Sequence, residues 1–257
     1  MSRCILTIAC GEKYRSQSET MLSSFLGHND GWAVERFYDD AIELPSIFKN
    51  DIVTPFNRCE IGRWTAMRKL LDKYDEVLYC DNDVLWYDEY RPLNASIVLS
   101  PHYITDKSKY SARNNLFWFG VYNIGLVYLK GREGQKECDF VIDNFLTRPR
   151  HFYMSPAFWR IEGSHATEIW LQGLAGFACT IGLDFAEDKD AGLNVAYWNI
   201  EAGDRSVFKR DGRFFVSCNG KEYPLRMFHF SNKIEQLERY DGVLKELYDD
   251  FKARNGI

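Results

Sequence analysis

The segment EVLYCDND, residues 76–83, decides the fold of this chain, because a short apolar run there ends directly in two acidic residues. A run of this length, bounded by charged and turn-forming residues, is typical of a strand that is buried on both faces. Asp81 and Asp83 follow it with no neutralising residue nearby in the sequence. Because unpaired carboxylates are costly to bury, we expect them to hold a ligand at the carboxyl end of the strand.

Strand and helix patterns alternate on the N-terminal side of this segment. The order implies a parallel sheet with helical crossovers, and ligands of such sheets bind beyond the carboxyl ends of the strands. We therefore expect Gly11, Phe37 and Asp81 to lie along one edge of a mostly parallel, Rossmann-like α/β sheet flanked by helices. The expected elements are strands over Cys4–Ala9 and Trp32–Phe37 and helices over Ser18–Leu26 and Ile61–Tyr74.

The second half of the chain has a less regular pattern. Asn219-Gly220 predicts a tight type I′ hairpin turn, because these residue types accept positive φ angles. No repeat, low-complexity tract or linker is evident, so we expect a single domain over residues 1–257. The expected elements are strands over Ile97–Ser100, Asn123–Leu129 and Tyr223–Phe230 and helices over Glu133–Leu146 and Lys233–Phe251.

Composition disfavours several classes of protein. Apolar residues make up 46% of the 257 residues, which is enough for a substantial core, and the net charge of −5 disfavours a nucleic-acid-binding protein. The seven cysteines form no CxxC pair, which favours a reducing compartment. No stretch resembles a signal peptide or a membrane span, so we expect a cytoplasmic protein, with a peripheral membrane contact left open.

The two acidic residues after the central strand predict a metal site. Carboxylate oxygens are hard ligands that suit Mg²⁺ or Mn²⁺, and such an ion can be shared with phosphate oxygens. Asp81 and Asp83 are therefore the first candidates for metal ligands.

Five segments carry a resemblance to a known family. YDEVLYCDNDVLW (residues 74–86) resembles the Asp-x-Asp strand of GT-A glycosyltransferases, above all the galactosyltransferase and glycogenin group, family eight. Residues 122–126 resemble its Asn-x-Gly strand, 228–231 its late histidine segment, and 8–14 its first strand and base-binding loop. Residues 193–199 are similar to a stretch of bacterial nucleotide-sugar transferases.

The resemblance implies a GT-A fold, a Mn²⁺ or Mg²⁺ ion held by Asp81, Asp83 and His229, and a nucleoside-diphosphate sugar as donor. It departs from the family where Asn232 and Lys233 stand in place of a glycine and a later diphosphate-binding lysine. The implied donor-binding residues are Ala9, Cys10, Gly11, Tyr14, Arg63, Asp81, Asn82, Asn123, Gly125 and Lys233, and the candidate catalytic residues are Asp83, Glu168 and Gln172.

Some of these residues also have a structural interpretation. His229 could be a core histidine between aromatic residues, and Asn123 and Gly125 could mark a close backbone approach. Arg63, or its neighbour Arg58, could bind donor phosphates or lie on a solvated helix face. The tryptophans Trp159, Trp170 and Trp198 could form an acceptor platform or pack in the core.

Together these features predict a metal-dependent glycosyltransferase that moves a sugar from a UDP-sugar to a hydroxyl of a glycan, glycolipid or glycoprotein. The resemblance favours retention of configuration, and in an inverting enzyme Glu168 would be the base. We expect residues 1–130 to bind the donor and residues 131–257, with the C-terminal helix, to bind the acceptor. The alternatives are a metal-dependent nucleotidyl or phosphoryl transferase and a non-catalytic protein that binds nucleotide sugars.

Overall fold

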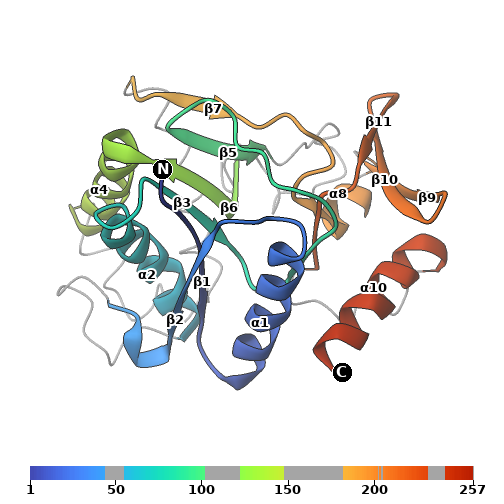
Figure 1. Cartoon of the computed structure of the whole chain (residues 1–257), viewed down its shortest axis with the longest axis horizontal. Coiled ribbons are helices and arrows are strands. Elements are labelled where there is room, and N and C mark those ends of the chain that lie inside the picture. Colours follow the sequence, from blue (N-terminus) through green and yellow to red (C-terminus); the bar gives the residue numbers. More distant parts are fainter. Residues whose placement is uncertain are drawn as a thin grey trace.

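A six-stranded sheet forms the centre of the molecule in the computed structural model (Figure 1). The structure describes residues 1–43, 55–101, 122–147, 182–201, 203, 205–230 and 241–256. The strand order is β2-β1-β3-β6-β5-β7. The strands are β1 (Arg3–Ala9), β2 (Ala33–Tyr38), β3 (Glu76–Cys80), β5 (Ile97–Pro101), β6 (Tyr122–Lys130) and β7 (Phe185–Glu187).

The strand directions confirm a mostly parallel sheet. β1 pairs in parallel with β2 and β3, and β5 pairs in parallel with β7. β6 runs antiparallel to both of its neighbours, β3 and β5, and is the one reversed strand among the described strands of this sheet. The carboxyl ends of β1, β2 and β3 therefore meet along one edge of the sheet, as predicted.

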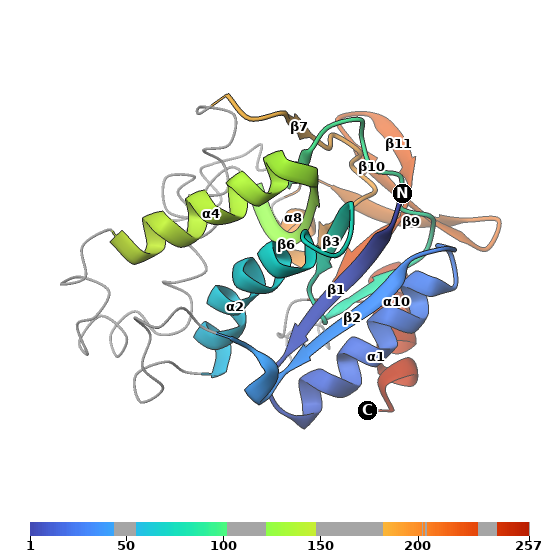
Figure 2. The ribbon, with the colours of Figure 1, turned by 60° about the vertical axis from the view of Figure 1, so that its left-hand side comes forward.

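Helices cover both faces of the sheet, which explains the continuous apolar runs of its strands (Figures 1 and 2). The side chains of β1 alternate, so that Leu6 and Ile8 face the core under α2 (Pro55–Leu70) and α4 (Gly131–Thr147), while Ile5 faces α1 (Glu12–Leu26). Among the described residues, no helix is long and apolar enough to cross a membrane.

The second half of the chain adds two small sheets. One has the order β4-β12-β8 and the other β11-β10-β9, and the latter lies near α10 (Figure 1). Asn219 and Gly220 take positive φ angles of 51° and 73°, which confirms the predicted hairpin turn. The elements are β4 (Val84–Trp86), β8 (Val195–Ala196), α8 (Tyr197–Glu201), β9 (Ser206–Arg210), β10 (Arg213–Cys218), β11 (Lys221–Pro224), β12 (Met227–His229), α10 (Gly242–Asn255) and the short 3-10 helix η1 (Asp39–Ala41).

Two elements expected near the C-terminus differ from those in the structure. The expected strand Tyr223–Phe230 is two strands, β11 and β12, because the chain leaves one sheet after Pro224 and the backbone N–H of Arg226 donates to the Gly192 carbonyl. The expected helix Lys233–Phe251 is not continuous, since Asp241 is extended and α10 begins at Gly242. Residues 233–240 lie outside the described part.

The first helix is longer than its apolar pattern predicts. It begins at Glu12 and not at Ser18, because its first turn lies in solvent and carries no apolar stripe. The exposed turn follows Gly11 directly, so α1 starts at the edge where the ends of β1, β2 and β3 meet.

Glu137, on α4, predicts a pH-dependent stability. It is 1% exposed, neither carboxyl oxygen has a hydrogen-bond partner in the described chain, and burial raises the pKa of Glu137 from 4.5 to about 8. Folding above pH 4.5 then requires proton uptake, so stability falls as the pH rises towards 8. Glu137→Gln should stabilise the fold by on the order of 3 kcal/mol at pH 7 and far less at pH 5.

Urea unfolding at both pH values measures this effect, with the exposed Asp139→Asn as a control on the same helix. A gain of equal size at pH 5 and pH 7 would show that folding does not raise the pKa of Glu137.

Candidate metal and donor site

Asp81, Asp83 and His229 converge at the carboxyl edge of the central sheet. Each offers one ligand atom, and these atoms lie within 4.8 Å of one another. His229 Nε2 lies 3.1 Å from Asp83 Oδ1 and 3.7 Å from Asp81 Oδ2. Residues 146 positions apart thus form one cluster of two carboxylates and an imidazole.

Backbone pairing fixes this cluster. The Asp81 N–H donates to the Gly125 carbonyl on β6 at 2.9 Å, and the Phe230 N–H donates to the Asp83 carbonyl at 2.8 Å. His229 lies opposite Val84 in the antiparallel pair of β4 and β12. The turn between β3 and β4 is therefore held from both sides, by β6 and by the end of β12.

Gly125 leaves the space that the cluster needs. A Cβ atom at this position would lie 2.6 Å from Asp81 Oδ2, 2.8 Å from Asn123 Oδ1 and 2.8 Å from His229 Cε1. The Asn123 side chain turns back to accept the Gly125 N–H at 2.7 Å. The Asn-x-Gly strand thus lies directly against the acidic pair, and the close approach at Gly125 involves side chains as well as backbone.

The electrostatics of the cluster fit a cation. Burial raises the pKa of Asp81, and the neighbouring Arg63 guanidinium and His229 act against this rise. Asp83 is 4% exposed and His229 is 6% exposed, so water compensates little of the charge. Two carboxylates and one imidazole are a donor set that divalent Mn²⁺ or Mg²⁺ accepts, and the residues present therefore fit such an ion.

Arg63 and Tyr79 contact the other oxygen of Asp81. The Tyr79 hydroxyl donates to Asp81 Oδ1 at 2.6 Å, and Arg63 Nη2 lies 3.7 Å from the same oxygen. Arg63 is 2% exposed, stacks over the Tyr79 ring at 4.5 Å and donates to the Ile124 carbonyl at 2.8 Å. Arg63 therefore does not lie on a solvated helix face, and the contact made by Tyr79 was missed from the sequence.

Tyr79 holds Oδ1 of Asp81 while Oδ2 faces His229, and this predicts a role in positioning. Tyr79→Phe should weaken Mn²⁺ binding about tenfold, because hydrogen bonds to metal ligands typically tune affinity by one to two orders of magnitude. Mn²⁺ titration followed by electron paramagnetic resonance measures the change. Tyr74→Phe, which removes a hydroxyl bound to Glu35 instead, is the matched control and should leave the affinity unchanged.

The loop after β1 lies beside the cluster. Gly11 has a φ of 93°, and its N–H donates to Asp39 Oδ1 at 2.9 Å. Asp39 also pairs with Arg15, and these bonds lower the pKa of its carboxyl. The side chain of Asn82 donates to the Ile8 carbonyl at 3.3 Å, which ties the acidic turn to the end of β1.

The other predicted donor residues of this loop differ in exposure. Ala9 and Cys10 are buried, Gly11 is exposed, and Tyr14 is half-buried in the first turn of α1. The structure thus brings this loop and the acidic turn together at one sheet edge. The contact of Asp39 with Gly11 holds this loop. No pattern in the sequence marks Asp39 as a residue of the site.

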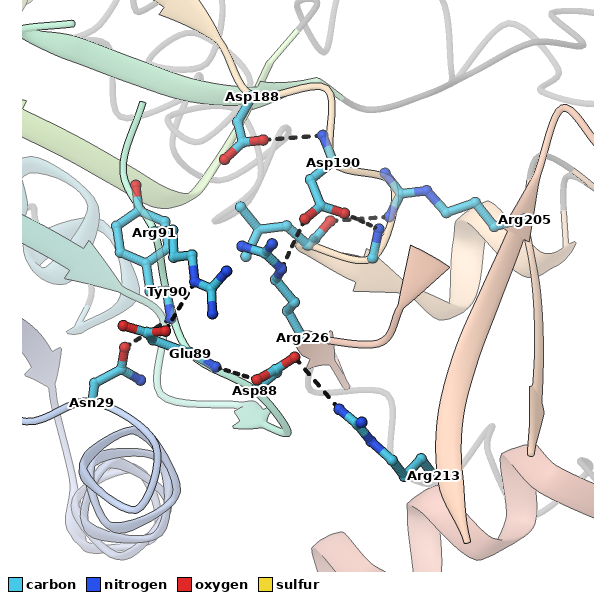
Figure 3. A network of polar contacts seen from close by, with 12 residues as sticks. Asn29, Asp88, Glu89, Tyr90, Arg91, Asp188, Asp190, Arg205, Arg213 and Arg226 are labelled. Carbon is cyan, nitrogen blue, oxygen red and sulfur yellow. Dashed lines mark hydrogen bonds and ion pairs between the residues drawn. The ribbon is translucent and has the colours of Figure 1, made fainter. Parts of the chain in front are cut away.

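A polar network joins the loop before β8 to Arg226 (Figure 3). Arg226 forms an ion pair with Asp190 at 2.8 Å, and the Asp190 N–H donates to Asp188 Oδ1 at 3.0 Å. Arg205 donates to the carbonyl of Leu193, which lies just ahead of β8. Because Arg226 directly precedes β12, this network fixes the entry of the strand that carries the histidine.

Several residues predicted from the sequence lie outside the described part of the chain. They are Glu168, Gln172, Lys233, Trp159 and Trp170. For Trp198 only the backbone is described, and it belongs to α8.

Comparison with known proteins identifies the fold. No protein-family profile and no curated protein sequence matches the chain. It is similar to the solved glycosyltransferase GlyE of Streptococcus pneumoniae TIGR4, with 14% identity, a TM-score of 0.52, and coverage of 98% of this chain and 60% of that chain. The apo form of GlyE gives 14% identity and a TM-score of 0.50 at the same coverage.

A glycosyltransferase involved in the glycosylation of the major capsid of PBCV-1 aligns over 97% of this chain and 99% of that chain, at 10% identity and a TM-score of 0.46. The chain spans about 60% of the length of the GlyE structures, and membership of family eight stays a prediction. At these identities the likeness establishes the fold, and the chain has the GT-A glycosyltransferase fold.

Proposed function

We propose that this protein is a metal-dependent glycosyltransferase that takes a sugar from a nucleoside-diphosphate sugar and transfers it to a hydroxyl group of an acceptor. The observation that carries the proposal is the convergence of Asp81, Asp83 and His229 at the carboxyl edge of a GT-A sheet. Ligands of open α/β sheets bind at this edge. A nucleotidyl or phosphoryl transferase would use the same acids, but such enzymes often have a glycine-rich or basic phosphate loop after the first strand. The loop after β1 has one glycine and two basic residues, Lys13 and Arg15, which is a weaker signal.

The chain's own residues have separate roles in this proposal. Asp81, Asp83 and His229 would hold Mn²⁺ or Mg²⁺, and Tyr79 would fix the orientation of Asp81. When bound, the ion supplies positive charge that stabilises the diphosphate leaving group. No side chain then needs to protonate the leaving group, unlike in a glycosidase.

The donor site in this proposal combines the loop after β1 with the Asn-x-Gly strand. Gly11 and Tyr14 would lie near the nucleobase, and Asn123 and Gly125 near the donor sugar. We propose UDP as the nucleotide and retention of configuration, in which a donor phosphate oxygen takes the proton of the acceptor hydroxyl. If the configuration inverts, Glu168 is our candidate for the base.

The remaining assignments are also proposals. Residues 1–130 would set the identity of the donor, and residues 131–257 that of a glycan, glycolipid or glycoprotein acceptor, with Trp198 among the acceptor residues. We propose Gln172 as a catalytic residue beside Glu168. We propose Lys233 as a residue that binds the donor diphosphate. We also propose a cytoplasmic location, on the ground that the seven cysteines are widely spaced and form no CxxC pair.

A thermal-shift titration tests the proposal directly. UDP, GDP and CMP are each added with and without Mn²⁺, and we expect a rise in melting temperature for UDP that requires the metal. Hydrolysis of UDP-glucose or UDP-galactose in the same conditions then distinguishes an enzyme from a binding protein. Stabilisation by nucleotides that is independent of any divalent ion would contradict the proposed metal site.

The histidine allows a sharper test. His229→Ala should raise the Mn²⁺ concentration needed for half-maximal UDP binding at least tenfold, because it removes one of three ligands from the cluster. His28→Ala, an exposed histidine at the end of α1, is the control. An unchanged Mn²⁺ requirement in His229→Ala would assign the imidazole to the core and not to the metal.

A further inference from the structure

Two cysteine thiols lie in contact at the edge of the proposed donor site. Cys59 Sγ is 3.0 Å from Cys10 Sγ, and the thiol of Cys59 donates to the sulfur of Cys10. Cys10 directly follows β1, and Cys59 lies in the second turn of α2. Neither sulfur is in a disulfide, and closing the remaining gap to a sulfur–sulfur bond of about 2.05 Å requires a movement of about 1 Å.

This pair differs from three of the other cysteines that the structure describes. Cys59 is half-buried and so within reach of small solutes, whereas Cys4, Cys80 and Cys138 are 0% exposed. Burial raises the pKa of the thiols of Cys4, Cys80 and Cys138, which disfavours their reactive thiolate form. The hydrogen bond from Cys59 lowers the pKa of the Cys10 thiol, and the nearby Arg58 acts in the same direction.

The position of the pair connects it to the candidate site on both sides. Cys10 precedes Gly11, whose backbone is held by Asp39 at the start of the donor loop. Cys59 and Arg63 are four residues apart on α2, so they lie on the same face of that helix, and Arg63 contacts Asp81. A covalent link between the two sulfurs would therefore join the donor loop to the helix that supports the acidic pair.

We propose that Cys10 and Cys59 form a reversible disulfide whose formation weakens nucleotide binding at the adjacent site. A peroxide is the oxidant. The thiolate of one cysteine attacks hydrogen peroxide and becomes a sulfenic acid with release of hydroxide, and the second thiolate then attacks that sulfur and releases a second hydroxide. The two hydroxides take up the two thiol protons, so two thiols and one hydrogen peroxide give one disulfide and two waters.

The expected effect on binding follows from the displacement. The two sulfurs approach by about 1 Å, and the backbone of Cys10 and Gly11 moves with them or is held in a new position. Displacements of about 1 Å in a binding site can cost two orders of magnitude in activity. We expect the affinity for UDP with Mn²⁺ to fall at least tenfold in the oxidised protein and to recover fully with dithiothreitol.

The experiment has two independent readouts on the full chain. Hydrogen peroxide at low excess is added, remaining thiols are blocked with iodoacetamide, and peptide mapping should find a Cys10–Cys59 cross-linked peptide with the other cysteines blocked. Isothermal titration of UDP with Mn²⁺ then compares reduced, oxidised and re-reduced protein. Cys59→Ser should bind UDP as the reduced protein does and lose the response to peroxide, and recovery with dithiothreitol excludes methionine oxidation, which this reagent does not reverse.

The outcomes separate this inference from the proposed function on which its binding effect rests. The inference would be overturned if iodoacetamide blocked both thiols after oxidation. It would also be overturned if the cross-link formed and the UDP affinity stayed unchanged. A reduced protein that binds no nucleotide with any metal would overturn the proposed function, while a mapped Cys10–Cys59 disulfide would still stand as a modification site.

Discussion

Asp83→Asn is expected to lower the rate of sugar transfer by about a thousandfold or more while leaving the fold intact. The substitution removes one negative charge from a group 4% exposed and 3.1 Å from His229 Nε2. An ion that neutralises a developing diphosphate contributes several kcal/mol to the barrier, and about 4 kcal/mol corresponds to a thousandfold in rate. The measurement is the rate of UDP-sugar hydrolysis over a range of Mn²⁺ concentrations, in parallel with urea unfolding.

The fold should survive because the substitution keeps the backbone contact that Asp83 makes with the end of β12. Its carbonyl accepts the Phe230 N–H, and asparagine preserves both that carbonyl and the size of the side chain. Removing a buried acid next to a second one also relieves charge repulsion, so the unfolding free energy should stay the same or rise slightly.

Asp88→Asn is the matched control, since Asp88 lies five residues further along, beyond β4, and pairs with Arg213 at 3.8 Å. It should keep the wild-type rate. Transfer by Asp83→Asn at near wild-type rate in Mn²⁺ would remove the metal from the mechanism.

Several elements of the fold could be predicted from the sequence because their patterns are local. The run Glu76–Cys80 is a strand with the predicted bounds, because a short run of five consecutive buried residues is typical of a strand covered on both faces. The Asn219-Gly220 turn was predicted from the φ angles that its residues accept. The parallel pairing of β1, β2 and β3 follows from their helical crossovers.

What the sequence could not predict depends on contacts between distant segments. The reversed direction of β6 is set by its insertion between β3 and β5, and no pattern within the strand itself records it. The break between β11 and β12 depends on Gly192, which approaches the Pro224 carbonyl so closely that a Cβ atom would lie 1.9 Å from it. In the sequence, residues 223–230 form one continuous run of strand-forming residues, so the pattern does not indicate the break.

The candidate site shows the same division. Asp81 and Asp83 could be identified because they interrupt an apolar pattern, and His229 was found through a resemblance in chain order. Tyr79 could not be identified, because a tyrosine in a buried strand normally signals packing, and its hydroxyl reaches Asp81 through the alternation of side chains two residues apart. Asp39 reaches Gly11 from the end of the neighbouring strand, which the sequence places 28 residues away.

Gly125→Ala should have the second large effect, and it tests the geometry of the site without changing any charge. The added Cβ would lie within 2.8 Å of Asp81, Asn123 and His229, closer than side chains normally allow, so at least one metal ligand must move. Because ligand positions matter at the level of about 0.5 Å, we expect Mn²⁺-dependent UDP binding to weaken about a hundredfold. Isothermal titration with UDP and Mn²⁺ measures the loss.

The loss should be local. The φ angle of Gly125 is not positive, so alanine is compatible with the strand, and alanine restricts the unfolded chain more than glycine does. These two effects of alanine offset part of the free-energy cost of the clash. We therefore expect the unfolding free energy to change by about 1 kcal/mol or less. Gly27→Ala, whose Cβ would meet backbone oxygens at an ordinary 3.5 Å, is the control and should bind UDP normally. If Gly125→Ala binds UDP and Mn²⁺ as well as the wild type does, Asp81 and His229 do not bind one metal ion in the arrangement that the structure gives them.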